Sequence, residues 1–333
     1  MVQFDLFGEV ERKLEARTRQ RAEKATKSPE PASASAVSHR RFRAFPTDPQ
    51  RHAADIADNV IAAWFSHYGG SRMDVPLGAV AALTLIREPL VGDRLLALDA
   101  TQLPQLLREI WGVQWMVRPD LIEMARPLHS WIEEDPDEYQ LRAVQAAIHT
   151  AVRKGLLDLT ARDDPFYRSQ ADVLSPLLTG LRHKSDKKWR GEYHTPTSVT
   201  DLMARVLVDG NHCEPGMSIR EPAIGSGGMF RSVAQQLREL GLNPHDFYWY
   251  GNDLDPVAAA CAAVNAIVWD LGPKVAIWCG DTLASSDSGL DKALAERAAV
   301  IRHRNAVVEQ AVFEQKTRRL LHAFDQLLEG TAA

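Results

Sequence analysis

Residues 221–228 read Glu-Pro-Ala-Ile-Gly-Ser-Gly-Gly, after a strand-like stretch over 218–221 and before a helical pattern over 229–240. The segment therefore predicts a strand, a glycine turn and a helix. Glycines after a strand let backbone N–H groups approach a ligand, and the N-terminus of the next helix favours a carboxylate or phosphate. Phe230 stands where a dinucleotide-binding fingerprint has its third glycine, which argues against NAD.

Two further strands are predicted downstream. Residues 247–253, Phe-Tyr-Trp-Tyr-Gly-Asn-Asp, indicate a buried strand, and an alanine-rich helix is expected over 256–271. Residues 274–280 indicate another strand. Successive strand–helix–strand units imply a parallel sheet with right-handed crossovers, which binds ligands at the carboxyl ends of its strands.

Acidic residues occur at all of these expected strand ends: Glu221, Asp253 and Asp281. A carboxylate at the second end can accept both hydroxyls of a ribose, and one at the third end can accept an adenine amino group. Each has a structural alternative. Gly280-Asp281 is typical of a turn, and Asp255 is expected to cap the following helix whether or not Asp253 binds a ribose.

The rest of the chain predicts helices. Residues 51–180 carry apolar side chains at three- and four-residue spacing, as Ile56, Val60 and Trp64 do, and are expected to form a helical domain. Residues 1–50, with a Pro/Ser/Ala-rich stretch, are expected to be a disordered tail. The fold class is therefore α/β: an N-terminal helical domain, a partial Rossmann-like sheet over 181–285 and a C-terminal helical segment over 286–333.

Composition sets broad limits on the class of protein. The 333 residues are 45% hydrophobic and 25% charged, with a formal net charge of −5, so any nucleic-acid binding must depend on local basic patches. No apolar run has the length of a membrane span, and the N-terminus lacks a secretory signal pattern. The cysteines, Cys213, Cys261 and Cys279, share no metal or disulfide spacing and are expected to be buried thiols in the cytoplasm.

One more motif lies upstream of the sheet. Residues 191–196 read Gly-Glu-Tyr-His-Thr-Pro and precede an amphipathic helical pattern. With 221–228, 251–255 and 280–283, this order of motifs resembles the adenine-N6 DNA methyltransferases of the type I restriction–modification methylation-subunit kind. Glu221 replaces the family's usual Asp, and Ile224 a usual Cys. The resemblance covers residues 165–285 well and the rest loosely.

The resemblance implies binding of S-adenosylmethionine by a methyltransferase half-domain over 181–285. It assigns the cofactor contacts to these residues: Thr195 and Pro196 beside the methionine end, Gly225, Ser226 and Gly227 around it, Glu221 orienting the glycine loop and the amino group, Asp253 at the ribose and Asp281 at the adenine ring.

The family's catalytic loop has no counterpart in this sequence. Asn/Asp-Pro-Pro-Tyr/Phe, which holds the flipped adenine, should follow Gly280, but no proline occurs after Pro273. Residues 286–330 show no strand pattern either, so the expectation is a chain truncated after the third cofactor motif. The nearest string, Asp163-Asp164-Pro165-Phe166-Tyr167, is interpreted as a helix start. The catalytic residues are therefore unknown, and the histidines show no metal-ligand pairing.

Three hypotheses follow: a DNA adenine methyltransferase whose missing half comes from a second chain, a non-catalytic or truncated homologue that binds DNA or a partner, and a helical interaction protein with a vestigial sheet. Expected partners are DNA and a specificity subunit or a second chain, and no membrane. DNA contact is assigned to the segment 182–190 and to basic residues of the C-terminal helix, with solvated helix faces as the alternative: Arg297, Arg302, Arg304, Lys316, Arg318 and Arg319.

Overall fold

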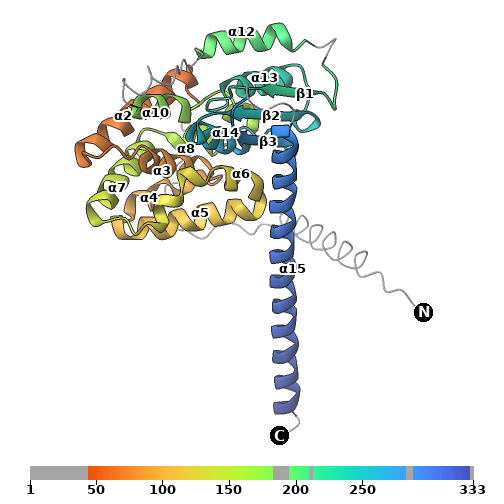
Figure 1. Ribbon diagram of the computed structural model, residues 1–333. Helices are drawn as coiled ribbons and strands as arrows, with labels where there is room; N and C mark the ends of the chain where they lie inside the picture. Colours follow the sequence, from red (N-terminus) through yellow and green to blue (C-terminus); the bar gives the residue numbers. More distant parts are fainter. Residues whose placement is uncertain (1–43, 183–194, 210–212, 283–287, 331–333) are drawn as a thin grey trace, which may run out of the picture. The chain divides into compact units, whose positions relative to one another are not determined.

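The computed structural model describes residues 44–182, 195–209, 213–282 and 288–330 (Figure 1). The described residues all belong to one compact unit. The predictions for residues 1–43 and for the basic segment 183–190 lie outside the described residues, as does the first part of the 191–196 motif. The domain boundaries expected from the sequence stay predictions.

Between Pro49 and Leu181 the structure is helical, as the spacing of apolar residues predicts. Trp64 and Trp131 are among the side chains fully buried in this part. The α-helices are α2 (Pro49–His67), α3 (Asp74–Thr84), α4 (Gly92–Ala97), α5 (Leu103–Val117), α6 (Pro119–Met124), α7 (Glu138–Arg153), α8 (Leu156–Thr160), α9 (Pro165–Arg168) and α10 (Leu174–Leu181). Short 3-10 turns lie between them: η1 (Pro89–Val91), η2 (Ala100–Gln102), η3 (Arg126–Leu128) and η4 (Ser130–Glu133).

The described residues contain one small parallel sheet of three strands, in the order β1-β2-β3. The strands are β1 (Ser218–Glu221), β2 (Tyr248–Asp253) and β3 (Val275–Cys279). Helix α13 (Gly228–Glu239) and the short turn η5 (Pro244–Asp246) connect the first two, and α14 (Pro256–Val268) connects the last two. The predicted parallel sheet of strand–helix–strand units is confirmed, in a chain that is otherwise rich in helix.

The pairing of strands decides which side chains share a face of the sheet. Ile219 pairs with Trp249, and Trp249 with Val275, so these three lie on one face. Phe230 of α13 packs on this face, with its ring centroid 5.1 Å from that of Trp249. Helix α14 contacts β2 and β3 on one side and α6, α3 and α10 on the other, so it joins the sheet to the helical part.

Three arginines converge on the carboxyl end of α14, whose last carbonyls have no partner within the helix. Burial lowers the pKa of the Arg87 and Arg238 guanidinium groups to about 10, so both still carry a positive charge at pH 7. The bonds are Arg87 Nη2 to the carbonyl of Ile267 (3.4 Å), Arg168 Nε to that of Val268 (2.6 Å), and Arg238 Nη2 to those of Trp269 (2.6 Å) and Asp270 (3.1 Å).

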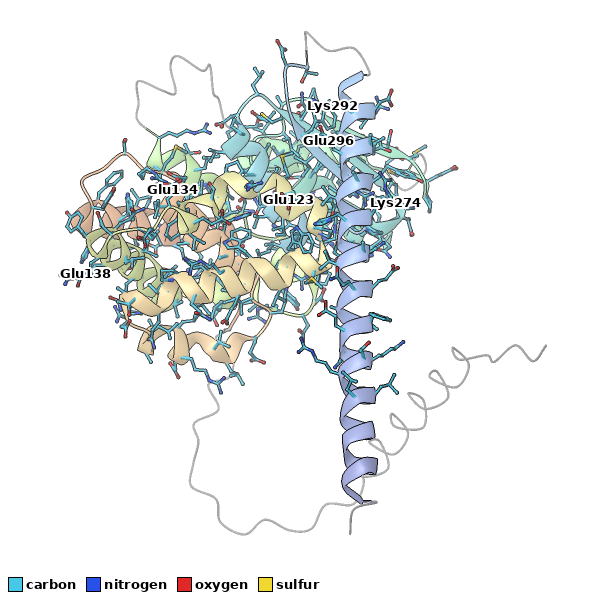
Figure 2. The ribbon with its side chains drawn as sticks, turned by 60° about the horizontal axis from the view of Figure 1, so that its bottom comes forward. Glu123, Glu134, Glu138, Lys274, Lys292 and Glu296 are labelled. Atoms are coloured by element: carbon cyan, nitrogen blue, oxygen red, sulfur yellow. The ribbon has the colours of Figure 1, made fainter. Side chains whose placement is uncertain are left out.

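The long helix α15 (Ser288–Gly330) begins against α6 and β3. Arg297 Nε lies 3.0 Å from Asp120, and Arg304 Nη1 donates to the carbonyl of Met116 at 2.5 Å. These two arginines therefore hold α15 in place, which corrects the interpretation of them as DNA contacts. In Figure 2 Lys292 and Glu296 mark the first turns of α15, and Glu123 lies on the adjoining α6.

Residues 311–321 of α15 are exposed on all sides. None of the described helices combines the length and the apolar character that a membrane span needs.

Removing the Arg168 guanidinium tests the cluster at the end of α14. Besides its bond to Val268, Arg168 donates through Nη1 to the carbonyls of Arg162 (2.6 Å) and Asp163 (2.5 Å), and its side chain is buried. Arg168→Leu leaves these acceptors unpaired, so we expect the free energy of unfolding to fall by about 2–4 kcal/mol in urea titrations.

The matched control is Arg142→Ala, which breaks the exposed pair with Glu138. Its expected cost is within about 0.5 kcal/mol. Equal losses in the two variants would contradict the role given to the cluster.

Candidate functional site

The glycine loop after β1 depends on a left-handed backbone. Gly227 has φ of 95° and directly precedes α13, and Gly225 has φ of 55°. A Cβ on Gly227 would lie 3.1 Å from the ring of Trp269. Both conformation and space therefore require glycine at 227, and the turn leads directly into the N-terminus of α13.

Asp253, at the end of β2, anchors this loop. Its two carboxylate oxygens accept hydrogen bonds from the backbone N–H of Gly225 at 2.7 Å and of Asp255 at 2.9 Å. Each oxygen accepts one of these bonds and so keeps a lone pair for a ligand. The side chain of Asp253 is only half-buried, so a ligand can reach it. The carboxylate is thus fixed in direction before any ligand arrives.

A side-chain bridge ties the third strand end to the other two. Asn252 Nδ2 donates to the carbonyl of Gly280 at 3.0 Å and to the hydroxyl of Thr282 at 2.5 Å. The Thr282 hydroxyl donates to the carbonyl of Pro222 at 2.9 Å. Because this chain of bonds runs from the β3 turn to the β1 turn, the three strand ends form one rigid rim.

Glu221 lies on the same rim. Its Oε1 accepts the N–H of Ala223 at 3.1 Å. Burial raises the pKa of this carboxyl above its ordinary value, and the nearby Asp253 carboxylate raises it further. Glu221 therefore takes up a proton more readily than an exposed glutamate, and a positively charged ligand group beside it would restore its ionisation.

The structure brings most of the predicted cofactor residues to this rim. Glu221, Gly225 and Asp253 are joined through the contacts above, and Asp281 follows Gly280 as an exposed residue. Ser226 lies in the loop, but its side chain is buried and its hydroxyl donates to Asp172 at 3.2 Å, away from the rim.

Thr195 and Pro196 are exposed residues directly before α12 (Thr197–Leu207). That helix packs on α13, where the Ser232 hydroxyl donates to that of Thr200 at 2.8 Å and Arg231 pairs with Asp201. The approach of Thr195 and Pro196 to the glycine loop stays a prediction.

The structure confirms the predicted helix caps but not the predictions for Arg182 and Cys279. Asp164 and Asp255 cap α9 and α14, as expected. Arg182 is buried against Asp255, so it is not a free phosphate contact. Cys261 is buried, but Cys279 is exposed beside Asp253 and the prediction for it was wrong: β3 ends there, at the open rim.

Three residues of the site were missed: Asn252 and Thr282 of the bridge, and Asp172 beneath the loop. Asn252 adjoins the predicted Asp253, but no sequence signal pairs Asp172 with a loop some fifty residues away. No cluster of metal-ligating side chains occurs among the described residues.

Comparison with known proteins identifies a family for part of the chain. Residues 173–316 match the N-6 DNA Methylase family. The family resemblance carried by the four motifs is therefore confirmed, and the N-6 DNA methylase segment includes the whole rim.

Two proteins that the chain is similar to have names that refer to type I systems. The type I restriction enzyme MjaIX methylase subunit of Methanocaldococcus jannaschii is 37% identical over 81 residues, which are 24% of this chain but only 14% of the relative. The type I restriction–modification system methyltransferase subunit of Streptococcus thermophilus is a solved structure with a TM-score of 0.39 and 11% identity, covering 71% of this chain and 59% of that one. The chain thus spans only part of the length of each of these two proteins.

The raised pKa of Glu221 gives a prediction about stability. Because the folded-state pKa lies above that of the unfolded chain, ionisation of Glu221 opposes folding. Glu221→Gln should therefore raise the melting temperature at pH 7. The advantage should vanish below about pH 4, where the carboxyl is protonated in both states. A variant less stable than the wild type at pH 7 in thermal unfolding would contradict this.

Proposed function

We propose that the N-6 DNA methylase segment binds S-adenosylmethionine at the carboxyl ends of β1, β2 and β3. In this proposal the chain belongs to a restriction–modification or related DNA-modification system of the cytoplasm that methylates adenine at N6. The observation that carries it is the anchored carboxylate of Asp253, held by the N–H of Gly225 at the open end of a parallel sheet.

The chemistry of the rim fits this cofactor. S-adenosylmethionine presents a positive sulfonium, an ammonium, two ribose hydroxyls and an adenine amino group, and all of these favour acceptors or negative charge. Glu221, Asp253 and Asp281 supply three carboxylates. A dinucleotide pyrophosphate would instead meet like charge here, which agrees with Phe230 in place of a third glycine.

In this proposal each predicted residue contacts a particular part of the cofactor. Asp253 accepts the ribose hydroxyls, and Asp281 the adenine amino group. The turn from Gly225 to Gly227 brings backbone close to the methionine end, Glu221 orients the ammonium, and Thr195 with Pro196 borders the same end. When bound, S-adenosylmethionine supplies a methyl group on a positively charged sulfur.

DNA and a partner chain complete the proposal. The relative from Methanocaldococcus jannaschii is named a methylase subunit of a type I restriction enzyme, and we extend to this chain DNA as substrate and a specificity subunit or a second chain with the catalytic loop as partner. The exposed cations of α15 suit phosphate contact: Arg302, Lys316, Arg318 and Arg319.

A second candidate is a homologue that binds DNA or a partner without transferring methyl groups. One observation favours it: the 333 residues contain no Asn/Asp-Pro-Pro-Tyr/Phe string. That string would supply the side chain and the aromatic ring that hold the base, so binding and transfer have to be tested separately.

Calorimetric titration tests cofactor binding. Asp253→Ala removes the acceptor of two hydroxyls and releases the N–H of Gly225, so we expect the dissociation constant for S-adenosylmethionine to rise at least about 100-fold. The control is Asp58→Ala, an exposed carboxylate of α2 whose loss should leave affinity unchanged. A wild-type chain that gives no binding heat overturns the proposed cofactor site.

Transfer of a labelled methyl group tests the two candidates against each other. We expect the 333-residue chain to bind S-adenosylmethionine and yet to leave adenine-containing DNA unlabelled, because the 333 residues contain no Asn/Asp-Pro-Pro-Tyr/Phe string. Label appearing at adenine N6 with the chain alone would rule out the binding-only candidate.

A further inference from the structure

A buried polar cluster lies beneath the glycine loop and is shared by three segments of the chain. Asp172, just before α10, is 6% exposed, Ser226 of the loop 3% and Asn265 of α14 3%. Asp172 Oδ2 accepts the Ser226 hydroxyl at 3.2 Å, and Oδ1 accepts the side-chain amide of Asn265 at 3.2 Å. The same amide donates to the carbonyl of Ser226 at 2.8 Å, so Ser226 is held by both its side chain and its backbone.

The loop is thus fixed between two carboxylates from different parts of the fold. Asp253 accepts the N–H of Gly225 at the rim, and Asp172 accepts the hydroxyl of the next residue from below. The second carboxylate is itself fixed, because Oδ1 also accepts the N–H of Ser175 at 3.0 Å. A shift of the Asp172 segment therefore pulls on the loop through the Ser226 hydroxyl and, by way of Asn265, on the Ser226 carbonyl.

Stability alone does not account for a carboxylate at this place. Complete burial raises the pKa of Asp172, and its compensation comes from the amide, hydroxyl and N–H donors and from the charge of Arg231. A buried charge costs more than an apolar group of similar size, whereas a set of directed hydrogen bonds defines one geometry. The loop gains a defined position at this cost.

We propose that Asp172 is a positioning residue of the cofactor site: through Ser226 and Asn265 it holds the glycine loop in the form that binds S-adenosylmethionine. The inference rests on the proposed function. It makes a segment outside the sheet part of the binding machinery, although Asp172 itself lies beneath the rim and touches no cofactor.

A double-mutant cycle on cofactor affinity tests the proposal. By calorimetry we expect Ser226→Ala and Asp172→Ala each to raise the dissociation constant about 10-fold. Because both variants break the Ser226–Asp172 hydrogen bond, the double variant should lose no more than Asp172→Ala alone, about 10-fold rather than about 100-fold. Asp172→Asn keeps an acceptor for Ser175 and Asn265 and offers an N–H to the Ser226 oxygen, so its constant should stay within about threefold of the wild type.

A matched control separates positioning from general stability. Asp120 also has a largely buried side chain, 5% exposed, but it pairs with Arg118 directly before α6 and with Arg297 on α15. Asp120→Ala should lower the melting temperature without changing cofactor affinity. If Asp172→Ala behaves in the same way, or if the two losses multiply, the proposal is overturned.

Other outcomes are equally decisive. If Asp172→Ala does not fold, Ser226→Ala alone carries the test, and an unchanged constant for it overturns the inference. A wild-type chain that binds no S-adenosylmethionine refutes the proposed function and the inference together, whereas normal wild-type binding with unaffected variants refutes the inference alone.

Discussion

Helix α14 is the element on which the rest of the structure depends, and it is held at both ends by arginine. At its carboxyl end Arg87 and Arg168 donate to the last carbonyls, and Arg238 donates to the carbonyls of the two residues that follow. At its amino end Asp255, which caps the helix, is paired with the buried Arg182. Positively charged donors at the carboxyl end of a helix pair with carbonyls that lack a partner within the helix, and they interact favourably with the helix dipole. These bonds are therefore stronger than bonds between neutral groups.

The donors to α14 come from both parts of the fold, and this explains why one compact unit results. Arg87 and Arg168 belong to the helical part, whereas Arg238 belongs to α13 beside the sheet. The capping residue Asp255 is two residues from Asp253, so the helical part fixes the direction in which the β2 strand end opens. Asp172 extends the same arrangement to the glycine loop, and the rim is therefore supported from outside the sheet.

Much of the rim follows from local sequence. The glycine turn, the acidic strand ends and the helix caps at Asp164 and Asp255 are determined within a few residues of themselves, and the parallel pairing of β1, β2 and β3 follows from the connecting helices. Arg297 and Arg304 show the limit of this reasoning. As residues in a helical pattern they look like solvated cations, but in the structure they pair with Asp120 and with the carbonyl of Met116, far away in the chain.

The sequence by itself determined the order of elements, the family resemblance and the acidic residues at the strand ends, because glycine conformations, caps and strand patterns are set by neighbours in the chain. The tertiary structure decided which side chains support that rim. Asp172 carries no local pattern. Asn252 and Thr282 lie within the 251–255 and 280–283 motifs, but those motifs do not predict their hydrogen-bond partners. The roles of all three arise from contacts across 28 to 93 residues. Such contacts are fixed by packing rather than by neighbouring residues, so only the folded chain shows that Ser226 points to Asp172 and not to a ligand.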